Sequence, residues 1–216
     1  MASPQSQPRT AFMLIDVQQG LTHPTHWGPS RSNPLFERNA QSLLTSYRKL
    51  LASTSSSSSS TRHKIIHVQH SSLSSTSPLH PSSPGFAFQI FAKPINSELV
   101  IVKTVNSSFI GTNLESVLRE HFAGEPGKLY LAGLTTDHCV STTTRMAGNL
   151  KVADGEGGEE GEVVFVEDAT AAWRKGTGDE WFDAEIVHRV NAESLQEFAT
   201  IAKAEEVVRE WESWLA

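Results

Sequence analysis

Short apolar runs alternate with amphipathic segments along this chain of 216 residues. Short apolar runs are typical of buried strands, whereas apolar positions that recur every three or four residues are typical of helices that cover a sheet. The pattern predicts strands at 11–17, 64–69, 98–103, 128–132, 163–166 and 199–201. It predicts helices at 35–51, 113–122, 136–149, 180–198 and 204–214.

This alternation predicts an α/β protein. A helix that connects two neighbouring strands leaves them parallel, and successive connections cover both faces of the sheet. We therefore expect a Rossmann-like three-layer sandwich, in which a mostly parallel sheet of about six strands carries helices on both faces. No internal repeat interrupts the pattern, and nothing in it requires a second domain.

We expect one domain, residues 11–216, which follows a polar N-terminal segment and contains two polar insertions. Residues 1–10 lack the apolar core of a signal sequence, and we expect them to form a disordered lead-in. Residues 53–61 consist of serine and threonine alone, and residues 154–162 carry five acidic residues and no Lys or Arg. We expect both to be surface insertions, because such compositions offer too few apolar groups for packing.

The charge balance narrows the class of partner. The chain has 18 Lys and Arg against 24 Asp and Glu, a formal net charge of −6, which argues against nucleic acid or an anionic membrane as the main partner. No apolar run approaches the roughly 20 residues of a membrane span. The single cysteine, Cys139, excludes an internal disulfide and a zinc site built from several cysteines. We expect a cytoplasmic protein that acts on a small molecule.

Three residues that carry reactive groups stand at or after the ends of predicted strands. They are Asp16 near the end of the first, Lys103 at the end of the third and Cys139 after the fourth. Sites in parallel α/β sheets form beyond the carboxyl ends of the strands, so the topology would gather these side chains at one edge. An unpaired charge after an apolar run is costly, which favours pairing of Asp16 with Lys103. Each residue also has an ordinary structural interpretation, as a buried small hydrophobe, a turn cap or a solvated strand end.

Together the three groups suit nucleophilic catalysis. Cys139 would open a helix, where the helix dipole and free backbone N–H groups favour a thiolate. An adjacent Asp16 can accept the thiol proton, and Lys103 would compensate the negative charges. From the residues alone, a cysteine hydrolase is one interpretation beside the structural one.

Three segments carry a more specific signal than any single residue. They are residues 12–18 (FMLIDVQ), residues 102–112 (VKTVNSSFIGT) and residues 133–145 (GLTTDHCVSTTTR). In their sequence and order they resemble the opening strand, the lysine segment and the nucleophile segment of the isochorismatase-like cysteine hydrolases. The last part of the chain also fits the pattern of the family, at residues 168–170, His188, Leu195 and residues 198–199. The resemblance covers nearly the whole chain from Ala11 onward.

The resemblance implies a catalytic triad in which Cys139 is the nucleophile, Asp16 the proton acceptor and Lys103 the electrostatic partner. It implies an oxyanion hole made by the backbone N–H groups of Thr135 and Cys139, and a cis peptide bond between Leu134 and Thr135. The implied reaction is acyl transfer: the thiol attacks an amide-type carbonyl, an amine or ammonia leaves, and water hydrolyses the thioester. It implies no cofactor.

Branches of the family differ in chemistry. A nicotinamidase branch binds a metal through an Asp-x-His segment and a second His after the second strand. This chain has His67, His70 and His80 there but no Asp between Lys64 and Pro94, so we expect no metal. The isochorismatase branch proper cleaves a vinyl ether, and several of its members lack the cysteine, so Cys139 favours a metal-independent amide hydrolase. Isochorismate hydrolysis and non-catalytic binding on the same fold stay as alternatives.

Contacts with a substrate are harder to predict. The candidates are Trp27, Gln69, His70, Phe109 and Trp173, which follow the triad segments or end predicted strands. The aromatic residues among them could equally belong to the core or to a subunit contact.

The resemblance also implies assembly. Members of the family usually form dimers or tetramers through helical faces, so we expect a homo-oligomer. The C-terminal helix, which carries Trp211 and Trp214, is the candidate contact surface.

Overall fold

One six-stranded sheet organises the computed structural model, which describes residues 7–54, 62–95 and 98–215. The strand order is β3–β2–β1–β4–β5–β8, and every neighbouring pair is parallel. The strands are β1 (Arg9–Ile15), β2 (His63–His70), β3 (Leu99–Lys103), β4 (Gly127–Leu134), β5 (Glu162–Ala171) and β8 (Thr200–Ala202). The predicted α/β fold with a mostly parallel sheet of six strands is confirmed.

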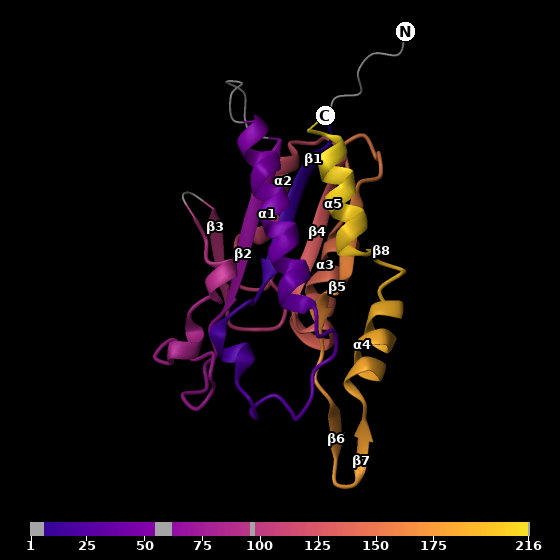
Figure 1. The fold of residues 1–216 in the computed structure, drawn as a ribbon. Helices are drawn as coiled ribbons and strands as arrows, with labels where there is room; N and C mark the ends of the chain where they lie inside the picture. The colour runs from indigo at the N-terminus through magenta and orange to yellow at the C-terminus, as the bar shows by residue number, and fades with distance from the viewer. Residues whose placement is uncertain (1–6, 55–61, 96–97, 216) are drawn as a thin grey trace.

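Helices cover both faces of this sheet (Figure 1). The helices are α1 (Phe36–Thr54), α2 (Leu114–Phe122), α3 (Ser141–Leu150), α4 (Ala184–Glu193) and α5 (Ala204–Ser213). α1 and α5 pack on one face, and α2 and α3 pack on the other. Among the described residues, none of the helices is both long enough and apolar enough to cross a membrane.

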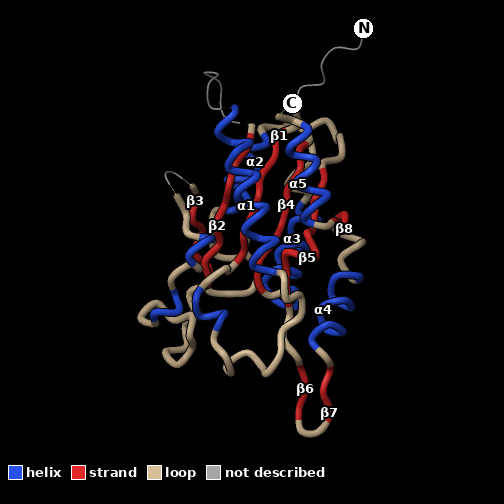
Figure 2. The backbone as a smooth tube through the Cα atoms, in the orientation of Figure 1, coloured by secondary structure: helices blue, strands red, loops and turns tan. Residues whose placement is uncertain are grey.

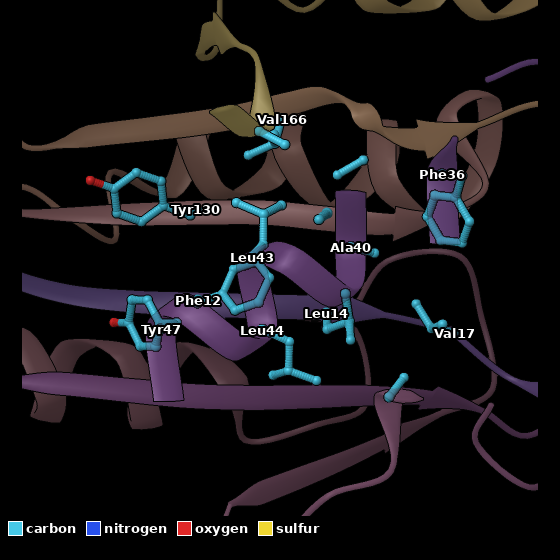
Figure 3. Close-up of a cluster of buried hydrophobic side chains, with 14 of the residues drawn as sticks. Phe12, Leu14, Val17, Phe36, Ala40, Leu43, Leu44, Tyr47, Tyr130 and Val166 are labelled. Carbon is cyan, nitrogen blue, oxygen red and sulfur yellow. The ribbon is translucent and has the colours of Figure 1, made fainter. Parts of the chain in front are cut away.

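β1 lies at the centre of the sheet and is buried on both faces. Phe12 and Leu14 point into the cluster under α1 and α5, whereas Met13 and Ile15 point into the cluster under α2 and α3. Figure 3 shows the first cluster, where Tyr47 and its apolar neighbours on α1 lie over β1. This two-sided burial explains why residues 11–15 of the strand are an unbroken apolar run.

The apolar face of the C-terminal helix packs in the core. Trp211 of α5 is fully buried and packs edge-on against the rings of Phe12, Tyr47 and Tyr130. Trp214 is partly buried and stacks on a histidine ring of β2. The ring of Trp211 is therefore covered within one chain and is not free for a second subunit, while a contact through the rest of α5 stays a prediction.

The predicted helix 180–198 begins too early and ends too late. Its first residues form β7 (Glu180–Phe182), which pairs with β6 (Lys175–Thr177) in an antiparallel hairpin. The hairpin extends away from the sheet at the lower end of Figures 1 and 2. α4 starts only after Asp183, whose side chain accepts a hydrogen bond from the backbone N–H of Glu185 and so caps the helix.

Other boundaries also differ from the pattern. β1 begins at Arg9 and β5 continues to Ala171, because backbone pairing extends beyond the apolar residues. The predicted helix 136–149 is divided into a π-helical turn, η4 (Thr136–Val140), and α3. Residues 154–162 connect α3 to β5 and are exposed at their centre. Residues 1–6 of the expected lead-in and 55–61 of the serine-rich segment lie outside the described residues.

Candidate active site

The candidate site lies where the direction of the strand order reverses. The chain runs outward from β1 through β2 to β3 and then returns to β4 on the other side of β1. Asp16 directly follows β1, and Cys139 lies in the η4 turn that follows β4. Ligands of open α/β sheets bind outside the carboxyl ends of the strands at such a switch point.

Lys103 reaches this point from the edge of the sheet. It pairs in register with His70 of β2, and β2 separates β3 from β1. Its side chain extends past the end of β2 and donates a hydrogen bond of 2.7 Å from Nζ to Oδ2 of Asp16. The two side chains are only 0% and 2% exposed, so this is a buried ion pair.

The third group completes a compact cluster. Nζ of Lys103 lies 3.2 Å from Sγ of Cys139 and 3.1 Å from Nδ1 of His70, and it also donates to the backbone oxygen of Val105 at 3.1 Å. The ligand atoms of Asp16, His70 and Cys139 lie within 4.8 Å of one another. The structure thus brings the three predicted triad residues into mutual contact, together with His70.

The backbone at Asp16 is held in an unusual conformation. Its φ is 53°, in the left-handed region that few residues other than glycine adopt. Its N–H donates to the oxygen of Val68 and its oxygen accepts from the N–H of Gln18. Among the described residues, Oδ1 of Asp16 has no hydrogen-bond partner. This oxygen is therefore available to accept a proton.

The electrostatics of the cluster favour a neutral thiol at rest. Burial raises the pKa of Cys139, and the negative charge of Asp16 raises it further, while Lys103 only partly opposes these effects. Burial by itself would lower the pKa of Lys103, but the adjacent negative charge of Asp16 is the main opposing effect, and the pKa is raised. The prediction of a thiolate favoured by a helix start is therefore wrong in direction. A neutral thiol would need a base in order to react, and the carboxylate of Asp16 is adjacent to it.

The turn that carries Cys139 has an irregular backbone. The peptide bond between Leu134 and Thr135 is cis, as the sequence resemblance implies. The oxygen of Thr135 accepts hydrogen bonds from the N–H groups of His138 and Val140, which closes the π-helical turn. Thr135 and Cys139 both line the same cavity.

A network of buried polar side chains holds the η4 turn in place. Oγ1 of Thr136 lies 2.8 Å from Nδ1 of His188 on α4 and 3.0 Å from Oγ1 of Thr170 on β5. Asn33, which precedes α1, approaches Nε2 of His188 at 3.2 Å and donates to the backbone oxygen of Thr170. Segments far apart in the chain thus fix the turn. In the sequence, only the match of His188 to the pattern of the family could have indicated that this residue supports the turn.

A cavity of about 120 Å³ opens beside the cluster. Several predicted residues line it: Asp16, Trp27, His70, Thr135, Cys139 and Trp173. Gln69 and Phe109 do not. The side chain of Gln69 donates to the backbone oxygen of Phe86, and Phe109 packs in the core cluster under α2 and α3.

Sequence reasoning missed part of the lining: Leu21, Leu79, Asn106, His138 and Lys175. Lys175, on the hairpin, and His138 both approach Oδ2 of Asp137, at 3.2 and 3.1 Å. Sγ of Cys139 also lies 3.8 Å from Oδ1 of Asn106. Asn106 and His138 lie within the lysine segment and the nucleophile segment, which could have indicated them. No local signal marks Leu21, Leu79 or Lys175, because their positions depend on how loops return to the sheet edge.

The three histidines of the region where the nicotinamidase branch binds its metal have separate partners. His67 pairs with Glu98 at 2.8 Å, and His80 bonds to the hydroxyl of Ser82. Within residues 7–54, 62–95 and 98–215, the one compact group of potential metal ligands is Asp16, His70 and Cys139. The ammonium of Lys103 contacts all three members of that group.

Comparison with known proteins identifies the family. The pattern of the Isochorismatase domain family matches residues 10–193. The chain belongs to the isochorismatase family. It is 35% identical over 207 residues to YrdC of Bacillus subtilis (strain 168), an uncharacterized isochorismatase family protein, covering 95% of this chain and 97% of YrdC.

Solved structures of the isochorismatase family share the fold. An isochorismatase-family protein from Chromobacterium violaceum ATCC 12472 superposes with a TM-score of 0.78 at 30% identity, covering 99% of this chain and all of that one. A cysteine hydrolase from Pseudomonas syringae pv. phaseolicola 1448A has a TM-score of 0.75 at 21% identity, with 99% of each chain covered, which shows likeness of fold. This protein is accordingly an isochorismatase-family hydrolase.

Proposed function

We propose that this isochorismatase-family protein is a cysteine hydrolase that cleaves a small amide-type C–N bond through a thioester intermediate. The observation that carries the proposal is the convergence of Asp16, Lys103 and Cys139, whose reactive atoms meet beside a cavity at the sheet switch point. A carboxylate, an ammonium and a thiol in contact are the groups that nucleophilic acyl transfer requires.

The first half of the proposed reaction forms the acyl-enzyme. Asp16 takes the proton of the Cys139 thiol as Sγ attacks the carbonyl carbon of the substrate. The backbone N–H groups of Thr135 and Cys139 stabilise the developing oxyanion, which is the main electrostatic contribution in such reactions. The C–N bond then breaks, and the proton held by Asp16 passes to the leaving nitrogen.

The second half regenerates the thiol. Asp16, again a carboxylate, takes a proton from water as the water oxygen attacks the thioester carbonyl. The C–S bond breaks, a carboxylic acid leaves, and the proton returns from Asp16 to sulfur. Lys103 stays charged throughout and offsets the negative charge that alternates between Asp16 and the sulfur.

The cavity supports a small substrate. Its volume of about 120 Å³ is below the roughly 150 Å³ that suffices to hold benzene. Leu21, Leu79, Trp27 and Trp173 provide apolar walls, while Asn106, His138 and Lys175 add polar groups beside the reactive cluster. Apolar walls with polar groups that can orient a ligand are typical of sites for small molecules.

A screen of small amides, ureido acids and imides tests the proposal, with ammonia or amine release as the readout. We expect Cys139→Ala to abolish turnover and Asp16→Asn to reduce kcat by about 10²–10⁴-fold, because proton transfer then lacks its base. Mass spectrometry of the wild-type protein during turnover should detect an acyl adduct on Cys139.

The rival chemistry has a separate readout. Isochorismate hydrolysis releases pyruvate and needs no acyl-enzyme. If Cys139→Ala still releases pyruvate from isochorismate, the proposed amide hydrolysis is rejected in favour of vinyl ether hydrolysis. Full amide turnover by folded Cys139→Ala would rule out the proposed nucleophile.

A further inference from the structure

The ammonium of Lys103 occupies the centre of a ligand set that is typical of a metal ion. Its Nζ lies 2.7 Å from Oδ2 of Asp16, 3.1 Å from Nδ1 of His70 and 3.2 Å from Sγ of Cys139. One oxygen, one imidazole nitrogen and one sulfur surround a single positive charge. The set is compact, since the three ligand atoms lie within 4.8 Å of one another.

The chemistry of these three groups selects a thiophilic divalent cation. Zinc binds thiolate, imidazole and carboxylate at about 2.0–2.3 Å, and three protein ligands with one open position are common in zinc sites. The contacts to Nζ are longer than this, so the ligands would have to close in by about 0.5–1.1 Å. His70 and Cys139 are only partly buried and line the open cavity, which leaves room for that movement.

The imidazole is already oriented as a ligand. Lys103 donates to Nδ1 of His70, so the proton of the neutral ring lies on Nε2 and Nδ1 offers its lone pair. Gln18 fixes the strand end by accepting from the backbone N–H of His70 and donating to its oxygen.

The carboxylate also requires a cation. The side chain of Asp16 is 2% exposed, and its Oδ1 has no hydrogen-bond partner among the described residues. A buried carboxylate without a nearby positive charge is strongly disfavoured. Removing the ammonium therefore leaves a buried negative charge beside a nitrogen and a sulfur ligand.

We propose that Asp16, His70 and Cys139 form a binding site for a thiophilic divalent cation such as Zn²⁺, and that the Lys103 ammonium and the metal compete for it. In the wild-type protein the ammonium fills the position, so metal binds weakly. Replacing Lys103 by a neutral residue turns the same three groups into a tight zinc site. The inference does not depend on the hydrolytic reaction, because it concerns a binding equilibrium.

The test uses Cd²⁺ as the probe, because cadmium–thiolate absorption in the ultraviolet reports directly that Cys139 is a ligand. We expect Lys103→Ala to bind one Cd²⁺ about 100-fold more tightly than the wild-type protein, and Zn²⁺ to displace it. Lys103→Arg is the matched control: it keeps the charge and should bind no better than the wild type. Adding Cys139→Ala or His70→Ala to Lys103→Ala should weaken binding by about 100-fold.

A second variant guards against loss of folding. Lys103→Met keeps the length of the buried aliphatic chain, and Zn²⁺ should raise its Tm well above the shift seen for the wild type. Either neutral variant, folded but binding no more tightly than Lys103→Arg, overturns the proposal. So does tight binding without a thiolate band.

The wild-type protein provides a third arm that needs no Lys103 variant. A high concentration of Cd²⁺ should slow alkylation of Cys139, and it should have no such effect in His70→Ala. Equal protection in both proteins, or none in the wild type, contradicts a site that contains His70 and Cys139.

Discussion

Nζ of Lys103 lies 2.7 Å from Oδ2 of Asp16, and both side chains are almost completely buried. Removing one member of a buried ion pair leaves the other charge uncompensated. We therefore expect Lys103→Met and Asp16→Asn each to lower the free energy of unfolding by about 3–5 kcal/mol. The double variant should lose clearly less than the sum of the two, because it leaves no lone charge. Urea unfolding of the four proteins measures this.

An exposed ion pair provides the matched control. Arg209 and Glu205 are 3.8 Å apart on α5, and both are largely exposed. Arg209→Ala should change the free energy of unfolding by less than about 1 kcal/mol. Strict additivity of the Lys103 and Asp16 variants would contradict a stabilising interaction between them.

The hydroxyl of Thr136 connects the η4 turn, which carries Cys139, to α4. It lies 2.8 Å from Nδ1 of the buried His188. Thr136→Val keeps the shape of the side chain but leaves Nδ1 of the buried imidazole without this partner, which should cost about 1–3 kcal/mol of stability. The turn that carries Cys139 also loses a restraint, so we expect kcat to fall on the order of 10-fold or more with little change in KM. Kinetics with a substrate found in the amide screen measure the two constants.

Thr10→Val separates positioning from stability alone. Oγ1 of Thr10 is also buried, with Oη of Tyr47 at 2.6 Å and Nδ1 of His63 at 2.8 Å, but it lies at the opposite end of β1 from Asp16. This variant should lose similar stability and keep kcat. If both variants reduce kcat equally, the Thr136 hydroxyl has no special role in positioning the turn.

The sequence predicts the sheet and the reactive cluster for the same reason. β1 is buried on both faces and is a continuous apolar run up to Ile15. The edge strand β3 is also an apolar run, although Val100 and Val102 are exposed. The ends of both runs are therefore visible in the sequence, and Asp16 and Lys103 stand there. Parallel topology then brings the carboxyl ends together. His70 was visible in the same way, but its contact with the Lys103 ammonium depends on the pairing of β2 with β3, which the pattern does not reveal.

The features of the fold and the site that the sequence does not predict depend on contacts between distant segments of the chain. The residues 180–182 contain two aromatic side chains that fit a helical pattern, yet they pair with β6 because Gly178, with φ of 60°, reverses the chain. Trp211 stands on the apolar face of a helix, and that pattern alone cannot distinguish a core contact from a subunit contact. Lys175 reaches the cavity only because the hairpin forms.

Two buried histidines make stability depend on pH. His63 of β2 and His121 of α2 contact Thr10, and burial above all lowers the pKa of each from 6.5 to about 4. Between those pH values the unfolded chain binds more protons than the folded one. Stability is therefore full above about pH 6.5 and is lost as the pH falls toward 4, by at most about 3 kcal/mol for one such histidine. Urea unfolding at about pH 7.5 and about pH 5 measures the loss.

Variants assign this pH dependence to the buried rings. His63→Gln should reduce the stability at neutral pH but also reduce the loss between the two pH values, because one proton-linked group is gone. His26 is exposed, and His26→Gln should leave that loss unchanged. If the wild type and His63→Gln lose the same stability between the two pH values, the pH dependence comes from groups other than His63.

Gly133 allows β4 to approach β1 beside the reactive cluster. It pairs in register with Ile15, its φ is 129°, and a Cβ there would lie 2.0 Å from the backbone oxygen of Ile15. Gly133→Ala must therefore push the two strands apart where Asp16 and the Cys139 turn begin, and we expect a stability loss of at least about 3 kcal/mol together with loss of turnover. Gly158, in the acidic connection before β5, also has a positive φ but no atom within 4 Å of such a Cβ, so Gly158→Ala should cost only about 1–2 kcal/mol and keep activity. Comparable losses in the two variants would attribute the effect to backbone conformation rather than to the contact between β1 and β4.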